Sequence, residues 1–212
     1  MSWLRKRWVL LRHPHATIIF QRSVYIGPGF SLHIPDNGTF IVGPGVEFRR
    51  NFRAEISGNG RIVIGAGSYL TYDVILACTT SIEIGERCGL GQCLYITDGN
   101  HRYRDLDKPF LEQGYNFRPI TIEDDVQIFS KCTITNSIRK RAIIGANSMV
   151  TKPIPPYCVA GGVPARVIDY FGPPGGEPPE LARSTSKDDG SDKASPGLEP
   201  GLRDREKAVP DH

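Results

Sequence analysis

His101 is the residue whose type and position best fit acid–base chemistry. It closes the stretch Ile96-Thr97-Asp98-Gly99-Asn100-His101, so Asp98 lies three residues before it, and Asp105 follows four residues after it. A neutral imidazole can take a proton from a hydroxyl group, and a carboxylate on its second ring nitrogen would fix its tautomer. We expect His101 to act as a general base that Asp98 orients. The motif alone is also compatible with a histidine that is simply exposed in a polar loop.

The other histidines and the five cysteines indicate neither a metal site nor a nucleophile. A metal site on repeated strands needs about three converging imidazoles, whereas His101 is the only histidine in the regular half of the chain. The cysteines are odd in number and form no Cys-x-x-Cys pair, which argues against a disulfide framework and a zinc ribbon. We therefore expect no metal, a reducing compartment such as the cytoplasm, and buried packing roles for Cys88 and Cys132.

The element that must position His101 is a six-residue repeat. Large apolar residues recur at every sixth position, and small or β-branched residues mostly occupy the fifth position of each hexad. This period fits neither a helix nor a simple strand, but it is typical of the coils of a parallel β-helix, whose stacked strands lie about 4.8 Å apart. The apolar positions are Ile64, Leu70, Leu76, Ile84, Leu90, Ile96, Ile122, Ile128, Ile134, Ile144 and Val150.

The first sixty residues repeat less regularly. Ile26-Gly27-Pro28-Gly29 is echoed by Val42-Gly43-Pro44-Gly45 and by Ile64-Gly65-Ala66-Gly67, with short alternating runs between them. Short strands closed by glycine turns would also suit a β-sandwich, and only the later hexads favour the β-helix. We therefore expect one all-β domain over residues 24–171.

An insertion at residues 97–119 interrupts the repeat. It is rich in charged and aromatic residues, and an insertion of this length in a solenoid is usually functional, because the next coil must resume in register. We expect the substrate-binding surface here, with Arg102 and Arg104 as candidate contacts.

The two ends of the chain have a different composition from the repeat. Residues 1–23 would cap the domain, although the tryptophans and basic residues of 3–12 would also suit a weak contact with an anionic membrane surface. The apolar run there is too short for a secretory signal or a membrane span. Residues 172–212 carry many prolines and no aromatic residue or isoleucine, and we expect a disordered tail. The net charge of +3, without a clustered patch, argues against a nucleic-acid partner.

Two long motifs resemble those of a known family. The hexads, the loop ending at His101 and the stretch Ile144-Gly145-Ala146-Asn147-Ser148-Met149-Val150-Thr151-Lys152-Pro153-Ile154-Pro155 together resemble the hexapeptide-repeat acyltransferases. Cys158-Val159-Ala160-Gly161-Gly162-Val163-Pro164-Ala165-Arg166-Val167-Ile168 is similar to the family's closing motif. Within the family, the chain looks most like sugar and polysaccharide O-acetyltransferases of the maltose and galactoside type. The resemblance covers 64–168 well and the first sixty residues loosely.

This resemblance implies a left-handed parallel β-helix that forms a homotrimer, with acetyl-CoA in the groove between neighbouring subunits. His101 matches the family's general base on the acceptor hydroxyl. Asp73 lies near a position that contacts the acceptor in the sugar acetyltransferases, although a corner acid that faces solvent is equally compatible with the sequence.

The resemblance also implies a set of contacts with CoA. Backbone groups of Ser130, Gly145 and Ala146 would hold the pantetheine arm, and Lys152 and Arg166 would meet the phosphates. Gly145 and Ala146 would equally suit a tight coil corner.

The chain departs from the family pattern in two places. Gln127-Ile128-Phe129 stands where a tryptophan followed by Ile-Gly is common, and the run 135–143 is shorter than usual. Phe129 would narrow the CoA groove or alter the acyl donor.

Together these features predict acetyl transfer from acetyl-CoA to a hydroxyl group of a saccharide, in the synthesis of a surface polysaccharide or glycolipid. An aminosugar N-acetyltransferase is an alternative, because it would share the donor site and the base. A non-catalytic β-helix scaffold is a second alternative, which the histidine loop and the closing motif disfavour. The fold does not choose among the three; the acceptor pocket does.

Overall fold

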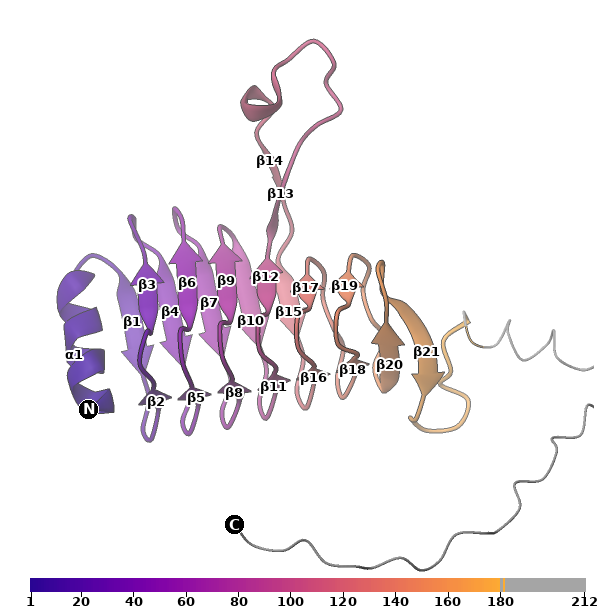
Figure 1. Cartoon of the computed structure of the whole chain (residues 1–212), viewed down its shortest axis with the longest axis horizontal. Helices are drawn as coiled ribbons and strands as arrows, with labels where there is room; N and C mark the ends of the chain where they lie inside the picture. Colours follow the sequence, from indigo (N-terminus) through magenta and orange to yellow (C-terminus); the bar gives the residue numbers. More distant parts are fainter. Residues whose placement is uncertain (180, 182–212) are drawn as a thin grey trace, which may run out of the picture.

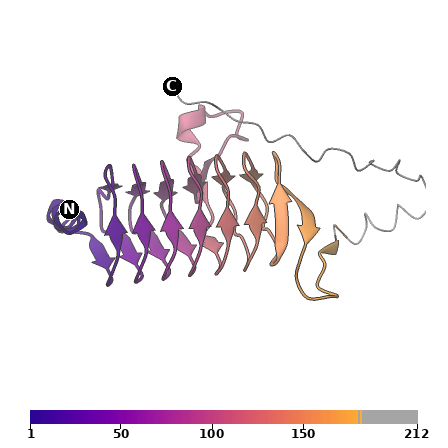
Figure 2. The ribbon, with the colours of Figure 1, turned by 60° about the horizontal axis from the view of Figure 1, so that its bottom comes forward.

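The computed structural model describes residues 1–179 and 181, which form an elongated rod of stacked coils with one loop projecting from its side (Figure 1). Residues 180 and 182–212, most of the predicted disordered tail, lie outside the described residues. Each coil contributes short strands to three parallel sheets, and Figure 2 shows successive coils side by side along the rod. The predicted left-handed parallel β-helix is confirmed.

The three sheets run along the rod, one on each side of the coils. Sheet A contains β1 (Thr17–Phe20), β4 (Thr39–Val42), β7 (Arg61–Ile64), β10 (Ser81–Ile84) and β15 (Ile120–Ile122). Sheet B contains β2 (Tyr25–Ile26), β5 (Glu47–Phe48), β8 (Tyr69–Leu70), β11 (Gly89–Leu90), β16 (Gln127–Ile128), β18 (Ile143–Ile144), β20 (Cys158–Gly161) and β21 (Arg166–Tyr170). Sheet C contains β3 (Ser31–His33), β6 (Arg53–Ile56), β9 (Ile75–Cys78), β12 (Tyr95–Thr97), β17 (Thr133–Ile134) and β19 (Met149–Val150).

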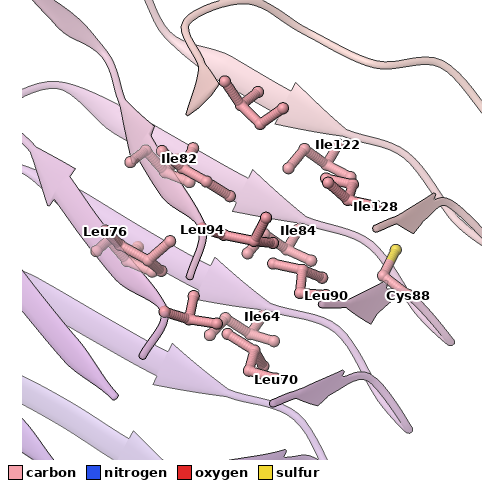
Figure 3. Packing of buried hydrophobic residues seen from close by; sticks show 14 of the residues in the cluster. Ile64, Leu70, Leu76, Ile82, Ile84, Cys88, Leu90, Leu94, Ile122 and Ile128 are labelled. Carbon is pink, nitrogen blue, oxygen red and sulfur yellow. The ribbon is translucent and has the colours of Figure 1, made fainter. Parts of the chain in front are cut away.

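The hexad positions form the core because the sheets pair them in register. Equivalent residues of successive coils lie opposite one another and are buried, and Figure 3 shows their side chains packed from coil to coil. Cys88 and Cys132 are buried as well, as predicted for packing thiols. The stacked sets include Ile64, Ile84 and Ile122 in sheet A, Leu70, Leu90 and Ile128 in sheet B, and Leu76, Ile96 and Ile134 in sheet C.

The first coils are filled by phenylalanine, which is why their hexads are hard to follow in the sequence. The rings of Phe48 and Phe52 lie 4.5 Å apart, and those of Phe30 and Phe52 lie 5.2 Å apart. The domain boundary predicted at residue 24 is wrong, because Thr17 already pairs with Thr39 at the start of sheet A. The β-helix therefore begins at Thr17, and the cap is shorter than 1–23.

Helix α1 (Ser2–Arg12) covers the N-terminal end of the rod (Figure 1). The Arg5 guanidinium donates to the carbonyl oxygen of Ile26 at 3.0 Å, and the Ile26 amide donates to the Ser2 hydroxyl at 3.0 Å. Val9 is buried in the core of the first coil. The capping role predicted for this segment therefore rests on both hydrogen bonds and apolar packing. Among the described residues, no helix is long and apolar enough to cross a membrane.

The C-terminal end of the rod is closed by an antiparallel pair. Strand β21 folds back on β20, and the Phe171 amide donates to the carbonyl oxygen of Tyr157 at 3.0 Å. The chain stays attached beyond the predicted boundary at 171, since the Tyr170 hydroxyl donates to the Pro173 carbonyl and Pro178 is buried. Any truncation that tests the tail must therefore lie after residue 181.

The predicted insertion leaves the rod as a two-stranded arm. Strands β13 (Gly99–His101) and β14 (Tyr115–Phe117) pair antiparallel, and the arm ends in a loop with the 3-10 helix η1 (Phe110–Glu112). Figure 1 shows the arm rising between β12 and β15. The repeat resumes in register after it, because Ile82 of β10 pairs with Ile120 of β15.

Candidate active site

His101 lies at the outer end of the paired strands of the arm, and its ring packs against two aromatic rings. It pairs with Tyr115 across the hairpin, and the two ring centroids are 4.2 Å apart. The Phe110 ring lies 4.9 Å away on η1. The Nδ1 atom of His101 is buried and has no hydrogen-bond partner among the described residues. The ring is therefore fixed by packing, while a nitrogen that can donate or accept a proton remains unpaired.

The predicted pairing of Asp98 with His101 is wrong. The buried Asp98 carboxylate instead accepts hydrogen bonds from the backbone amides of Thr79, Thr80 and Ser81 at 2.6 to 3.1 Å, and from the Thr80 hydroxyl at 2.7 Å. These bonds occupy both carboxylate oxygens. Asp98 therefore anchors the turn between β9 and β10 and does not set the tautomer of His101.

Cys78 is a further ionisable group near His101, and its thiol is not suited to nucleophilic attack. Burial, together with the nearby charge of Asp98, raises the pKa of Cys78 to about 12. The thiol also donates to Asp98 Oδ2 at 3.7 Å. Since the thiolate is the reactive form of cysteine, Cys78 is unreactive at neutral pH. This leaves His101 as the candidate for proton transfer.

A cavity of about 520 Å³ lies between the arm and sheet C, beside His101. One wall is aromatic, from Tyr115 and Phe117 of β14, and the other is polar, from the hydroxyl groups and the single carboxylate of sheet C and its turns. Its lining includes Glu55, Ser57, Thr79, Tyr95, Thr97, His101, Tyr115 and Phe117. A site of this composition suits a ligand that carries several hydroxyl groups and an apolar ring face.

Arg102 and Arg104 face a different cavity, of about 450 Å³, within the arm. The Arg102 side chain donates to Asn116 Oδ1 at 2.9 Å, and the Arg104 guanidinium lies 5.2 Å from the centre of the Tyr103 ring. Neither arginine lines the cavity beside His101. Within one subunit the structure therefore does not bring these predicted contacts to the candidate base.

Asp73 also lies apart from His101, at a corner between coils. Its backbone has a φ of 57°, and its carboxylate accepts a hydrogen bond from the Asn51 side chain at 2.9 Å. Corners of successive coils place Asn51, Asp73 and Cys93 in the same left-handed backbone conformation, which aspartate and asparagine tolerate better than most residues. The geometry accounts for Asp73 as a corner residue, and its predicted contact with an acceptor stays a prediction.

The backbone groups predicted to hold CoA lie on successive coils at the C-terminal end of the rod. The amides of Ser130 and Ala146 have no acceptor among the described residues, so neither donor is used within this part of the chain. The Gly145 amide donates to the Ala160 carbonyl at 2.8 Å, so it cannot also donate to a pantetheine arm. The predicted contact of the Gly145 backbone with CoA stays a prediction, without its amide as the donor.

Gly145 nevertheless differs from most corner glycines of the rod. A Cβ atom at Gly145 would come no closer than 3.6 Å to another atom, whereas one at Gly85 would lie 2.5 Å from Asp124 and one at Gly91 2.8 Å from the Phe129 backbone. The coils therefore require glycine at 85 and 91 but not at 145. A methyl group at Gly145 would meet only ordinary contacts, from Ala160 and Gly161 of the next coil and from the Ser148 hydroxyl.

Three further predicted or unusual residues lie on the surface of the same end. Lys152 follows β19 and Arg166 begins β21, and both side chains are exposed. Phe129 is also exposed, with most of its ring on the surface. A flexible molecule laid along this end would thus meet two cations and one aromatic ring, and the structure leaves their roles as predictions.

Among the described residues, no group of three or more histidine, cysteine or acidic side chains could hold a metal ion.

Comparison with known proteins identifies the family. A galactoside O-acetyltransferase of Escherichia coli is 31% identical over 173 residues, which are 79% of this chain and 70% of that protein. This chain belongs to the hexapeptide-repeat acetyltransferase family. A probable acetyltransferase of Mycobacterium tuberculosis is 29% identical over 175 residues, and the match spans 78% of this chain but only 57% of the length of that relative.

The solved structures of hexapeptide-repeat acetyltransferases share the fold. A galactoside acetyltransferase in complex with coenzyme A is 24% identical, with a TM-score of 0.51, and the match covers 81% of this chain and 72% of that one. This likeness supports the shape of the rod and not the role of any residue. A scan of the chain against protein-family models finds no match.

Glu55 lines the cavity beside His101, and the sequence did not single it out. The alternation in Arg53-Ala54-Glu55-Ile56 points Glu55 outward, and the pairing of Glu55 with Ala77 and of Ala77 with Thr97 carries this column to the base of the arm. Counting the register along sheet C would therefore have placed Glu55 near His101. Tyr115 lacked such a signal, because its position depends on the hairpin.

Proposed function

We propose that this chain transfers an acetyl group from acetyl-CoA to a hydroxyl group of a saccharide. The observation that carries the proposal is the position of His101, whose ring is fixed between Tyr115 and Phe110 beside a polar cavity. His101 takes the proton of the acceptor hydroxyl as its oxygen attacks the thioester carbon, and the carbon–sulfur bond then breaks to release CoA. The oxyanion forms near backbone amides, which stabilise it.

The composition of the cavity supports a saccharide acceptor. Glu55, Ser57 and Thr97 offer a carboxylate and hydroxyl groups to the hydroxyls of a sugar, and Tyr115 and Phe117 offer ring faces to its apolar side. The E. coli relative carries the name of a galactoside O-acetyltransferase. A sugar unit of a surface polysaccharide or glycolipid is the acceptor we favour.

The C-terminal coils support the CoA part of the proposal. The unpaired amides of Ser130 and Ala146 would hold the pantetheine arm, and Gly145, which has no side chain, would let the arm lie close to the coils. The exposed cations of Lys152 and Arg166 would meet the phosphates. Phe129 would lie along this path and narrow it.

We further propose that the protein works as a homotrimer in the cytoplasm, with residues 3–12 in weak contact with a membrane. The arm carries exposed apolar side chains, namely Leu106, Phe110, Leu111 and Phe117, which a neighbouring subunit would cover. A subunit packed there would also close the open side of the His101 cavity. Symmetric closure of this kind is the usual form of a homo-oligomer.

The test is a screen of acceptors with acetyl-CoA, in which the release of the CoA thiol measures the reaction. We expect release with one or more neutral sugars, and an acetylated product that mild alkali cleaves, as it does an ester. Release only with aminosugars, and a product resistant to alkali, would favour N-acetylation. Thiol release no faster than hydrolysis with every acceptor would favour the scaffold alternative.

A further inference from the structure

Helix α1 has two faces of different character. Ser2, Arg5, Lys6 and Val9 face the first coil and are buried or half-buried. The opposite face carries large apolar side chains that no described residue covers. They are Trp3, Leu4, Trp8 and Leu11, with exposed fractions of 61%, 61%, 56% and 76%. Contiguous apolar side chains on one exposed face mark an interaction surface.

The charge of this end of the rod is of one sign. Residues 1–35 contain five basic residues and no acidic residue. The guanidinium of Arg7 lies 5.0 Å from the centre of the Trp3 ring, and that of Arg12 lies 4.5 Å from the centre of the Trp8 ring. Each tryptophan therefore carries a cation beside its ring, and the two pairs form one surface, which we call the α1 surface (Trp3, Leu4, Arg7, Trp8, Leu11 and Arg12).

The position of the α1 surface leaves it free to meet a flat partner. Helix α1 lies across the end of the rod, as Figures 1 and 2 show, while the arm with His101 leaves the side of the rod further along. A second copy of the chain would be a poor partner for this face, because it would bring arginines against arginines. An anionic surface satisfies the charges and the apolar side chains at the same time.

We propose that the α1 surface binds an anionic membrane. The indole rings and leucines enter the boundary between headgroups and acyl chains, and Arg7 and Arg12 bind anionic headgroups. A single helix of this length gives weak, reversible attachment to the membrane surface. Its apolar face is too short for the helix to insert across the bilayer. This inference goes beyond the transfer reaction and does not depend on it, because it concerns a face separate from the His101 cavity.

The experiment uses the intrinsic fluorescence of the full chain, since its only two tryptophans are Trp3 and Trp8. Vesicles of phosphatidylcholine with a third of phosphatidylserine are titrated into the protein and compared with vesicles of phosphatidylcholine alone. We expect a blue shift of the emission and co-sedimentation with the anionic vesicles only. Raising the salt concentration should weaken both, because it screens the attraction.

The variant Arg7→Gln/Arg12→Gln should partition about thirtyfold less onto anionic vesicles, since each basic residue near such a surface contributes about 1 kcal/mol. The matched control is Arg50→Gln/Arg53→Gln, which removes two exposed charges from the side of the rod and should bind like the parent. Equal binding by the two double variants would overturn the proposal. It would also be overturned by equal binding to neutral vesicles, or by a blue shift that depends on protein concentration and not on lipid, which would indicate contact between copies.

Discussion

Asp98 holds the turn that forms one wall of the His101 cavity. Its carboxylate collects the amides of Thr79, Thr80 and Ser81, and Thr79 lines the cavity. A buried carboxylate that accepts several backbone N–H groups stabilises the conformation that presents them. At the residue scale, the site therefore combines one side chain able to move a proton with one that shapes its surroundings.

Asp98→Asn should lower the free energy of unfolding by about 2 kcal/mol or more, because an amide NH₂ would face amide donors that are buried with it. Asp105→Asn is the matched control, since Asp105 is exposed and its ion pair with Lys108 is 3.5 Å long. Urea unfolding of both variants provides the measurement. Equal stability of the two variants would show that the turn does not need the Asp98 charge.

The buried thiols predict how stability depends on alkaline pH. Burial raises the pKa of Cys78 to about 12 and that of Cys88 to about 11, above the ordinary value of about 9. Below pH 9 these thiols are protonated in both states, so stability is unaffected by them; above it the unfolded state ionises first, and stability falls as pH rises. The fall in unfolding free energy between pH 9 and 11 should be shallower in Cys78→Ala/Cys88→Ala than in the parent. Parallel curves would mean that the thiols titrate alike in both states.

The sequence singles out His101, whose role as the base stays a prediction, but it does not reveal the role of Asp98. The histidine stands out because it follows a regular hexad and is the only histidine in the regular half of the chain. The Asp98 carboxylate accepts hydrogen bonds from backbone amides of the previous coil. This could not be predicted, because the hexad period does not show which backbone amides at a turn lack a partner. Arg102 and Arg104 line a different cavity within one subunit for a similar reason, because the hairpin and not the hexad period decides which side of the arm they face.

At the scale of the elements, two corner glycines differ in whether the packing of the coils requires them. Gly85 is needed by the coil, because a Cβ atom there would lie 2.5 Å from Asp124, whereas a Cβ atom at Gly145 would meet only ordinary contacts. If the surface at Gly145 is kept clear for the pantetheine arm, a methyl group there should harm binding and not folding. The two positions thus form a natural pair for experiment.

Gly145→Ala should keep the melting temperature of the parent and raise the KM for acetyl-CoA about tenfold, which corresponds to about 1.4 kcal/mol of lost binding. Gly85→Ala should lower the melting temperature, because backbone atoms must move. Thermal unfolding and initial rates give both readouts. An unchanged KM in Gly145→Ala would remove this surface from the proposed CoA path.

The elements themselves were largely predictable from the second half of the chain. Ile64 to Val150 repeat with the period of a coil, and each of the predicted apolar positions is buried. The start of the rod was not predictable in this way, since Phe20, Phe30, Phe40 and Phe52 fill the early coils and hide the hexad. The six-residue spacing itself continues, because Phe20, Ile26 and Leu32 pair with Val42, Phe48 and Ala54 of the next coil. Phenylalanine, however, stands at positions that hold aliphatic or small residues later in the chain.

At the scale of the whole molecule, the arm is the feature that a lone rod leaves incomplete. Its apolar side chains are exposed, and Nδ1 of His101 lacks a partner. The repeat predicts a rod but carries no information on how rods associate, because assembly depends on the outward side chains. The trimer thus rests on the family resemblance and on the exposed arm.

Sedimentation equilibrium at micromolar concentration should give three times the mass of one chain, because the arm covers its apolar side chains only by packing on a neighbour. Leu106→Ser/Leu111→Ser, which removes apolar side chains from the arm, should shift the protein towards monomer. A monomeric parent would contradict the shared site, and a variant that stays trimeric would place the interface on another face of the rod.

The most direct measurement of the central claim is the turnover of His101→Ala on an established acceptor, with the release of CoA thiol as the readout. We expect kcat to fall by about 10² to 10⁴, the usual contribution of a positioned base, while CoA affinity and melting temperature stay near those of the parent. His33→Ala is the control, since His33 is exposed on β3 and does not line the cavity. Turnover of His101→Ala close to that of the parent and of His33→Ala would contradict the assignment of His101 as the base.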